Sequence, residues 1–402
     1  MILIDVCELI VDCPHSTAND EGAGYPLIRT PNVGKGRLIL DGVHRVSKQV
    51  YDVRNARAVP KAGDLILARE APAGNVAIIM EGQEVCLGQR TVLIRPDKSK
   101  VNPQYLTYYL LAPYAQHELT SAANGATVAH VNMPKIRGLK INLPDIQEQN
   151  RIAGFLSTYD DLIATNQKQI ALLEEAAQRI YKEWFIDFHF PGYENTPIED
   201  GVPKGWFYQP LSDVFDYVRG KSYTSSELSE DSGTLMVNLK NIRAFGGYKR
   251  NEEKRFTGDY KESQTLAPGD VVMGVTDMTQ ERRLVGHVAM IPDMKEPMTF
   301  SMDIIKIVPK TVTRNFLYSA CFYGGFSKQI SPLANGVNVL HLKPEAMMNL
   351  QMLVPTQKLI EQYDTIFEPI RCRIETLQNQ CILAEEARNR LLPKLMSGNN
   401  ND

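Results

Sequence analysis

Residues 144–186 read PDIQEQNRIAGFLSTYDDLIATNQKQIALLEEAAQRIYKEWFI, and this stretch decides the fold. Apolar side chains recur in it at alternating steps of four and three residues, the heptad spacing of a coiled-coil seam. The pattern predicts a helix over about 147–183, with Pro144 just before it and Pro191-Gly192 after it. The seam consists of Ile152, Leu156, Tyr159, Ile163, Asn166, Ile170, Leu173, Ala177, Ile180 and Trp184.

A second stretch, residues 355–396, reads PTQKLIEQYDTIFEPIRCRIETLQNQCILAEEARNRLLPKLM and has the same spacing. Two long heptad helices flank one globular region, which favours an intramolecular, antiparallel pair over separate packing. Asn166, the polar position of the first seam, is expected opposite an apolar residue, where it would help to set the register. The second seam consists of Tyr363, Phe367, Ile370, Ile374, Leu377, Cys381, Ala384, Arg388, Leu391 and Leu395.

The chain repeats itself. Asn124-Gly125 recurs as Asn335-Gly336, 211 residues later, and the same offset persists without a gap into the second heptad helix. Upstream the correspondence continues with small changes of offset, as loops of unequal length would produce. The pairs at offset 211 include His130/His341, Leu139/Leu350, Pro144/Pro355, Gln169/Gln380 and Arg179/Arg390. The upstream pairs are Leu3–Val6/Leu211–Val214, Asn32-Val33/Asn241-Ile242, Gly63-Asp64/Gly269-Asp270 and Gly74–Ala77/Gly286–Ala289.

These patterns predict an α+β protein in which two mixed α/β lobes are joined by two long helices that form an antiparallel coiled coil. The internal repeat is expected to give pseudo-two-fold symmetry. The expected domains are a first lobe at 1–144, a central helix at 145–189, a second lobe at 190–355 and a C-terminal helix at 356–398. Expected strands are 65–68, 76–80, 91–94, 271–273 and 304–308, expected helices are 105–119 and 315–330, and 190–205 reads as a linker.

Composition places the 402-residue chain among globular proteins, because 43% of its residues are hydrophobic and its formal net charge is only −3. The six cysteines include no C-x-x-C pair, and Cys7, Cys13 and His15 lack an evident fourth zinc ligand, so we expect reduced thiols and no metal. The start carries no basic leader and no run of about eighteen apolar residues occurs, so we expect a cytoplasmic protein without a membrane span.

The charges are unevenly distributed. Residues 29–69 hold nine basic and three acidic side chains, and residues 240–255 hold six basic and two acidic ones. The helix at 147–183 instead has six acidic and four basic residues. Because phosphates attract cations and Arg, Asn or Gln can read base edges, two basic lobes on an acidic rod suggest a protein that binds DNA through its lobes. The candidate DNA-contacting residues are Arg29, Asn32, Lys35, Arg37, Arg69, Asn238, Lys240, Asn241, Arg243, Arg282 and Arg283.

No catalytic constellation is evident in the sequence. Gly220-Lys221-Ser222 resembles the end of a phosphate-binding loop, but Phe215 occupies the position of the required upstream glycine. His130 and His341 have no nucleophile near them in sequence, so we expect hydrogen-bonded loop histidines. We therefore expect a chain without a catalytic, cofactor or metal site of its own.

The sequence resembles the specificity subunits of type I restriction–modification systems. The resemblance rests on five features: the NLPDIQEQNRI segment at 142–152, the EWFIDF segment at 183–188, Pro203-Lys204-Gly205-Trp206, the LLPKLMSG ending at 391–398, and the repeated Gly-Asp pairs and Asn-Gly to His loops. It departs from the family in two places. Glu361-Gln362 is shifted relative to Glu148-Gln149, so the second helix is expected to begin differently, and Leu3 has no Pro-Lys-Gly-Trp lead-in like that before Leu211.

The resemblance implies a non-catalytic subunit whose lobes each read one half of a bipartite DNA target. It also implies two modification subunits that use S-adenosylmethionine, and two restriction/translocase subunits that use ATP and Mg. Two alternatives remain at this point: a coiled-coil scaffold that joins protein partners without binding DNA, and an enzyme with an unfamiliar site in its lobes.

Overall fold

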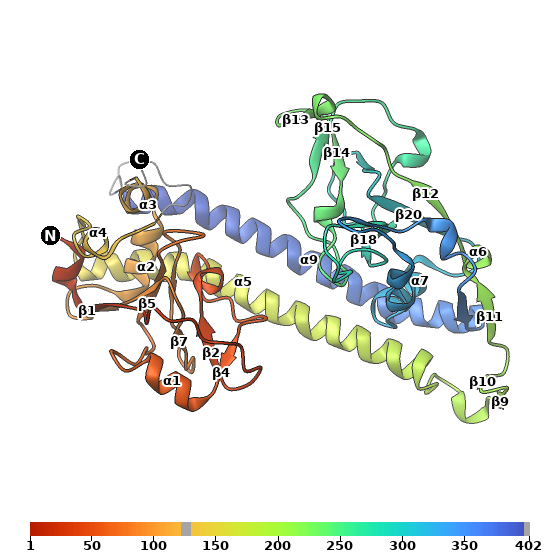
Figure 1. Ribbon diagram of the computed structural model, residues 1–402, viewed down its shortest axis with the longest axis horizontal. Helices are drawn as coiled ribbons and strands as arrows, with labels where there is room; N and C mark the ends of the chain where they lie inside the picture. Colours follow the sequence, from red (N-terminus) through yellow and green to blue (C-terminus); the bar gives the residue numbers. More distant parts are fainter. Residues whose placement is uncertain (122–129, 398–402) are drawn as a thin grey trace. The chain divides into compact units, whose positions relative to one another are not determined.

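The computed structural model describes residues 1–121 and 130–397. The predicted Asn124-Gly125 motif and Gly398 lie outside the described residues. The chain divides into two compact units, unit 1 (Met1–Gln167 with Asn379–Asp402) and unit 2 (Lys168–Gln378). Each unit contains one lobe and one half of each long helix, so the helices belong to both units while each lobe belongs to one (Figure 1).

Both long helices are present. Helix α5 spans Ile146–Tyr181 and continues into a π-helical turn at Lys182–Ile186, and helix α9 spans Gln357–Met396. The expectation that the second helix begins differently is wrong, because Gln357 lies 211 residues after Ile146 and so occupies the equivalent position. Because the Glu–Gln pair is shifted in α9, the first turns of the two helices make different contacts. Gln149 is buried and accepts a hydrogen bond from the Asn102 N–H at 2.9 Å, whereas its counterpart Ile360 is a buried apolar residue.

Within unit 1 the two helices pair antiparallel. Asp160 of α5 accepts a hydrogen bond from Arg388 of α9 at 2.5 Å, and Asn166 donates to Gln380 at 3.2 Å, so the partner numbers fall as the α5 numbers rise. Asn166 therefore lies opposite a polar residue, which corrects the expectation of an apolar one. The hydrogen bond that Asn166 donates to the Gln380 side-chain oxygen gives the buried amide a polar partner in the seam, which an apolar neighbour would not supply.

Within unit 2 the antiparallel pairing is made by aromatic rings. Tyr363 of α9 lies with its ring centroid 6.2 Å from that of Tyr181, 6.0 Å from that of Trp184 and 5.1 Å from that of Phe185. Arg373 also donates a hydrogen bond to Gln169 at 3.4 Å. Burial of these large rings supplies apolar area as well as favourable edge-to-face contacts.

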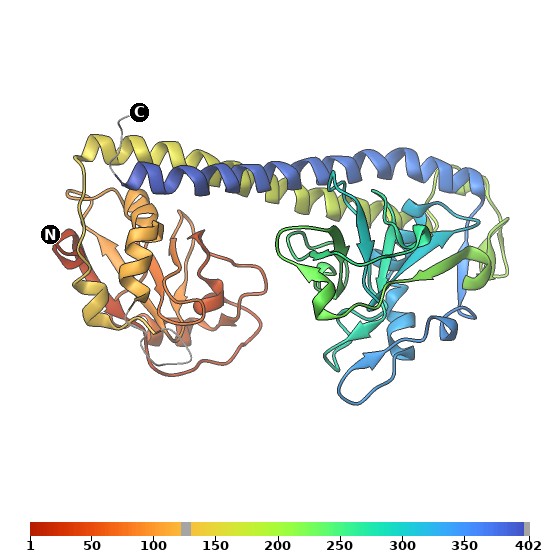
Figure 2. The same cartoon turned by 90° about the horizontal axis from the view of Figure 1, so that it is seen from above.

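The described residues of the first lobe form two small sheets and four α-helices. The larger sheet has the strand order β1-β8-β5-β6-β3, antiparallel except for β3 and β6, and the smaller one has the order β4-β2-β7. Helix α2 lies between the long helices and the larger sheet (Figure 2). The strands are β1 Cys7–Asp12, β2 Tyr25–Ile28, β3 Gly36–Arg37, β4 Arg45–Val46, β5 Leu65–Ala68, β6 Val76–Ile78, β7 Cys86–Leu87 and β8 Thr91–Pro96. The helices are α1 Lys48–Arg54, α2 Pro103–Leu111, α3 Pro113–Thr120 and α4 Met133–Arg137.

The second lobe repeats this plan. Its main sheet has the order β12-β20-β16-β18, and a second sheet has the order β13-β15-β14-β19. The strands of these sheets are β12 Phe215–Arg219, β13 Leu228–Ser229, β14 Thr234–Val237, β15 Lys254–Phe256, β16 Val271–Gly274, β18 Val288–Met290, β19 Met298–Phe300 and β20 Ile304–Pro309. Three two-stranded pairs add β9 Ile198–Glu199 with β10 Val202–Pro203, β11 Phe207–Pro210 with β22 Gln351–Val354, and β17 Thr276–Asp277 with β21 Leu340–His341. The helices are α6 Leu211–Val214, α7 Arg314–Phe322 and α8 Ser327–Ile330.

Two predicted helices are each divided in the structure. The segment predicted as one helix at 105–119 forms α2 and α3, because Pro113 lacks an N–H and starts a new helix after the extended residue Ala112. The segment predicted at 315–330 forms α7 and α8, and Gly325, at φ +69°, lies in the break between them. The five predicted strands are all present.

The repeat extends to individual hydrogen bonds. Gly63 and Gly269 have φ near +90° and +80°, and donate their N–H to Ile79 at 2.9 Å and Ile291 at 2.8 Å respectively. The aspartate that follows each glycine accepts a backbone hydrogen bond of 2.9 Å from the residue three positions before it, Lys61 or Ala267. Each aspartate also pairs with a cation: Asp64 with Arg95 at 2.7 Å, and Asp270 with Arg314 at 3.3 Å. The two lobes are therefore built on one frame.

The buried Asp160–Arg388 pair generates a stability prediction. Arg388→Ala leaves the Asp160 carboxylate, of which 2% is exposed, with the Tyr108 hydroxyl as its remaining partner. Since an uncompensated buried charge is costly, we expect the free energy of unfolding to fall by about 3–5 kcal/mol, measured by urea denaturation of the full chain. Arg179→Ala is the control, because it breaks the exposed Arg179–Glu175 pair and should leave the curve unchanged. Equal shifts for the two variants would contradict the assignment.

Candidate nucleic-acid interface

At one end of the main sheet of lobe 1, charged groups gather around Arg69. Its guanidinium donates to both carboxylate oxygens of Asp12 at 2.9 Å and to the Val131 carbonyl at 2.9 Å, and it lies 2.9 Å from Nε2 of His130. The other ring nitrogen of His130 lies 2.6 Å from a carboxylate oxygen of Glu70. Arg69 is buried, so its hydrogen bonds hold the ends of strands together and leave it little capacity for a phosphate. His130 is a hydrogen-bonded loop histidine, as expected.

The other candidates of lobe 1 fall into different environments. Asn32 is buried, and its side chain accepts from the Arg29 N–H at 3.2 Å and donates to the Ile39 carbonyl at 3.2 Å. Arg37 forms an ion pair of 2.6 Å with Asp161 of α5 and so braces the lobe against the helix. Lys35 is exposed and Arg29 is half-buried, and these two stay accessible to a phosphate.

In lobe 2, Asn238 and Asn241 are both buried. The side-chain oxygen of Asn241 accepts from the Asn238 N–H at 2.9 Å, and its side-chain NH₂ donates to the Lys249 carbonyl at 2.9 Å. This is the scheme that Asn32 makes in lobe 1, so the repeated asparagine closes the same short turn in both copies. Lys240 lies on this turn in lobe 2, and its side chain is exposed.

A loop between β17 and β18 carries Arg282 and Arg283. Asp277 organises this loop, because its carboxylate accepts backbone hydrogen bonds from Thr279 at 2.9 Å and Leu284 at 2.7 Å. Burial alone would raise the pKa of Asp277, but these hydrogen bonds lower it, so the carboxylate stays ionised. Arg283 is exposed beside Glu281, with which it forms an ion pair, and Arg282 lies within 3.5 Å of the Ala334 carbonyl.

The segment 335–341 packs against this loop. Strands β17 and β21 pair through Thr276 and His341, and the Gln280 side chain donates to the Val337 carbonyl at 2.7 Å. Two apolar side chains of this surface are strongly exposed, Met278 at 67% and Val337 at 89%. We call residues 277–284 and 335–339 the paired loops. Exposed amides, cations and apolar groups together are the side chains that can contact base edges and thymine methyl groups.

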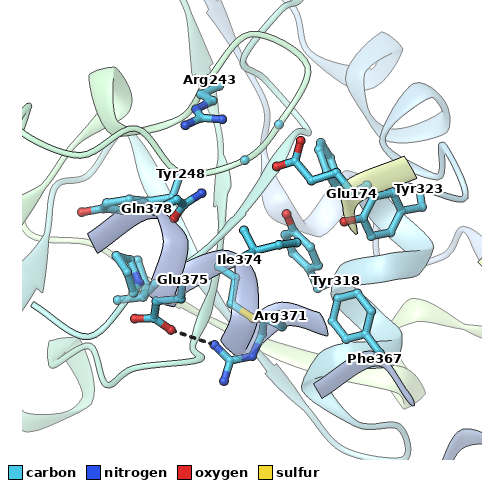
Figure 3. A pocket seen from close by; sticks show the side chains of 16 residues that line it. Glu174, Arg243, Tyr248, Tyr318, Tyr323, Phe367, Arg371, Ile374, Glu375 and Gln378 are labelled. Carbon is cyan, nitrogen blue, oxygen red and sulfur yellow. Dashed lines mark hydrogen bonds and ion pairs between the residues drawn. The ribbon is translucent and has the colours of Figure 1, made fainter. Parts of the chain in front are cut away.

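A pocket of about 130 Å³ lies inside unit 2, where lobe 2 meets both long helices (Figure 3). Glu174 of α5 borders it, and Arg243 lies on the loop across from it (Figure 3). Burial raises the pKa of Glu174, and the positive charge of Arg243 opposes that rise. Arg371 and Glu375 of α9 form an ion pair of 3.2 Å in the pocket wall. The Arg243 side chain is exposed, and its positive charge faces the Glu174 carboxylate of α5.

The paired loops carry exposed polar and apolar side chains that are not among the candidates chosen from the sequence, including Met278, Gln280 and Val337. The sequence identifies the Asn335 to His341 segment through the internal repeat and the family resemblance, and the candidate residues were chosen by charge and polarity. The available signal was the TDMTQERR run at 276–283, in which amide, hydroxyl, sulfur and guanidinium groups stand side by side. Among the described residues no group of three or more His, Cys, Asp or Glu side chains could hold a metal ion, and no helix is long and apolar enough to cross a membrane.

Comparison with known proteins matches residues 3–175 to the family model described as the type I restriction modification DNA specificity domain. Two specificity subunits of type I restriction enzymes from Methanocaldococcus jannaschii are similar over nearly the whole chain. MjaIX is 24% identical over 90% of this chain and 82% of its own length. MjaVIII is 23% identical over 93% of this chain and 85% of its own. The crystal structure of the S subunit of the type I restriction-modification system from M. genitalium shares the fold, with a TM-score of 0.56, 13% identity, and coverage of 98% of this chain and 95% of that one.

The repeated asparagines generate a prediction that separates structural from surface polar residues. Asn241→Ala removes a fully buried amide that satisfies two backbone groups, so we expect a loss of about 1–3 kcal/mol of unfolding free energy. Lys240→Ala, one residue away, changes an exposed side chain and should stay within about 0.5 kcal/mol of the parent protein. Urea denaturation of both variants measures the difference. Similar stability of the two variants would refute a framing role for Asn241.

Proposed function

We propose that the chain is a DNA specificity subunit of the type I restriction–modification family and that each of its two lobes reads one half of a bipartite, asymmetric target. It is a specificity subunit, not a catalytic one, and its partners are DNA and the other components of a restriction–modification complex. The main observation behind the proposal is that both lobes have the same hydrogen-bonded frame but carry loops of different length. The paired glycines lie at 63 and 74 in lobe 1 but at 269 and 286 in lobe 2, so lobe 2 has six more residues between them.

Because the two lobes share one frame but carry different loops, they are expected to read two different DNA half-sites, which makes the target asymmetric. The frame would present each lobe to the duplex in the same way, because its glycines and aspartates make the same bonds in both copies. The loops would differ in which bases they contact, because only lobe 2 has the longer loop organised by Asp277. Direct contacts to base edges carry the sequence information, whereas contacts to phosphates set position.

The proposed DNA-contacting set differs from the set chosen from sequence. The exposed or half-buried cations remain in it, and the paired loops of lobe 2 join it. We assign the buried Asn32, Asn238, Asn241 and Arg69, and the ion-paired Arg37, to the frame that holds the contacting loops. The retained cations are Arg29, Lys35, Lys240, Arg243, Arg282 and Arg283.

The long helices would set the spacing between half-sites and bind the other subunits. Both helices expose large apolar side chains that another subunit could cover. We propose that these side chains contact two modification subunits, which supply S-adenosylmethionine, and that two restriction/translocase subunits with ATP and Mg complete a cytoplasmic complex. The exposed apolar residues are Ile146, Phe155, Leu162, Leu172, Ile366 and Leu383.

Lys35 tests the electrostatic part of the proposal. Lys35→Ala in the assembled complex should weaken binding of every DNA sequence by a similar factor and reduce the slope of log K against log salt by about 1. Fluorescence anisotropy with labelled duplexes, recorded over a series of salt concentrations, measures both quantities. Arg179→Ala, on an exposed face of α5, is the matched loss of one positive charge and should leave the slope unchanged. An unchanged slope for Lys35→Ala would remove that residue from the contact set.

A lobe exchange tests modular reading. Replacing residues 206–340 by the equivalent lobe of another specificity subunit should change one half of the recognised sequence and keep the other half and the gap. A genome-wide map of methylated bases, made in strains with the parent gene, the exchanged gene and no gene, reads the outcome directly. If both halves change together, the lobes do not read independently. If the map is the same without the gene while the partner subunits are active, the scaffold alternative replaces the proposal.

A further inference from the structure

The hairpin at residues 335–341 carries an apolar side chain at its tip. Val337 is 89% exposed, so it buries little area within the fold. A single exposed valine is ordinary on a protein surface. Val337 differs because hydrogen bonds from both of the paired loops hold its part of the backbone, and because an amide and a cation accompany it on the same surface. These two features indicate which part of a DNA duplex the tip meets.

The hairpin is closed by its own backbone. The Asn335 N–H donates to the His341 carbonyl at 3.0 Å, and the His341 N–H donates to the Asn335 carbonyl at 2.9 Å. Gly336 lies at φ +151°, and a Cβ there would lie 1.9 Å from the carbonyl oxygen of Val339, so the turn requires glycine at this position. The next residue, Val337, therefore starts from a fixed backbone position.

The other of the paired loops also holds Val337. The Gln280 side chain donates to the Val337 carbonyl at 2.7 Å. Asp277, which is buried, fixes the base of that loop by accepting backbone hydrogen bonds from Thr279 and Leu284. Because the backbone of Val337 is already held, little conformational freedom is lost when another molecule covers its side chain.

Polar and charged groups accompany this apolar tip. Asn338, the next residue, has an exposed side-chain amide. In the other loop Met278 is strongly exposed, and Arg283 is exposed beside Glu281. Amide and apolar side chains can contact base edges and thymine methyl groups, while a guanidinium can contact a phosphate or a guanine. The composition of the tip therefore suits a DNA groove.

An amide next to an apolar group matches one base pair in particular. In the major groove, adenine offers N6 and N7 to an Asn or Gln side chain, and its partner thymine offers a 5-methyl group to an apolar side chain. An unmodified G·C pair has no methyl group there, and the minor groove presents none for either pair. The major groove also admits a two-stranded ribbon such as this hairpin. The Val337-Asn338 tip thus fits an A·T pair approached from the major groove.

The internal repeat separates the turn from its tip. Asn335-Gly336 recurs as Asn124-Gly125, whereas Val337-Asn338 is matched by Ala126-Thr127 at the same offset. This comparison is of sequence alone, because residues 122–129 lie outside the described part of the chain. The two residues that form the turn are the same in both copies, and the two that follow them differ. Such a difference is expected where two lobes read different bases.

We propose that Val337 covers the 5-methyl group of a thymine in the major groove of the half-site that lobe 2 reads, and that the Asn338 amide contacts an adenine next to it. The inference rests on the proposed function, because it requires lobe 2 to read a half-site, and it adds which base is read and through which group. The competing mode is a side chain inserted between two base steps, which does not depend on a methyl group.

Replacing thymine by uracil removes only the methyl group and leaves every hydrogen-bonding edge unchanged. The methylation map and the lobe exchange first assign one half-site to lobe 2. Each thymine of that half is then replaced in turn in labelled duplexes, and binding of the assembled complex is measured by fluorescence anisotropy. At one position we expect uracil to weaken binding about threefold to tenfold. A half-site without thymine on either strand, or no loss at any position, overturns the proposal.

Val337→Ala identifies the side chain that meets the methyl group. We expect it to weaken binding of the thymine duplex by a similar factor and to abolish the difference between the thymine and uracil duplexes, because both changes remove the same contact. Val308→Ala, at an exposed position of β20 outside the paired loops, is the matched control and should keep the full difference. Since Val337 is so exposed, its substitution should leave the fold intact. A loss of binding in Val337→Ala that leaves the difference between the duplexes unchanged indicates the inserted mode and overturns the proposal.

The proposed function and this contact fail in different ways. If no split motif depends on the gene, or if the lobe exchange alters both halves, the proposed function is wrong and the contact falls with it. If one half-site follows lobe 2 while the thymine–uracil difference persists in Val337→Ala, the proposed function stands and the Val337 contact is wrong.

Discussion

The antiparallel seam between α5 and α9 is the contact on which the rest of the structure depends. Each lobe packs against a part of both helices, so neither unit has a complete core unless residues far apart in the chain come together. In unit 1 a buried ion pair, Asp160 with Arg388, adds directional bonds to the seam. In unit 2 the seam is aromatic and centres on Tyr363. Ionic and amide contacts specify register, whereas aromatic contacts mainly contribute buried area.

Each lobe packs against this seam. Within each lobe a hydrogen-bonded frame of glycine, aspartate and asparagine residues stays the same while the loops around it differ. The glycine–aspartate turns at 63–64 and 269–270 and the asparagines at 32 and 241 are held by backbone hydrogen bonds that do not depend on the loops. Loops can therefore change in length and sequence while the sheet keeps its register. For a protein that must recognise one particular DNA sequence, such a division lets a target change without loss of stability.

The two copies have diverged most clearly where a helix end meets the start of the next lobe. Unit 2 covers this place with Trp206 and its neighbours, and unit 1 has a groove there bordered by Met396. In unit 1 the Tyr109 hydroxyl accepts a hydrogen bond from the Asn142 N–H at 3.2 Å.

The heptad spacing, the repeat and the strand positions could all be predicted from sequence, because periodicity and turn residues are local properties of the chain. The equal offset of 211 also carried the information that both helices begin at equivalent residues, although the shifted Glu361-Gln362 pair suggested otherwise. Only the tertiary structure decided which polar residues face outward. Lys240 and Asn241 are neighbours in sequence, yet one is exposed and the other is fully buried, because a single turn places consecutive side chains on opposite sides. The burial of Arg69 beside Asp12, and the pairing of Asn166 with Gln380, likewise arise from contacts between distant residues. Local pattern determines which elements form, and long-range packing determines which of their polar groups remain free to bind another molecule.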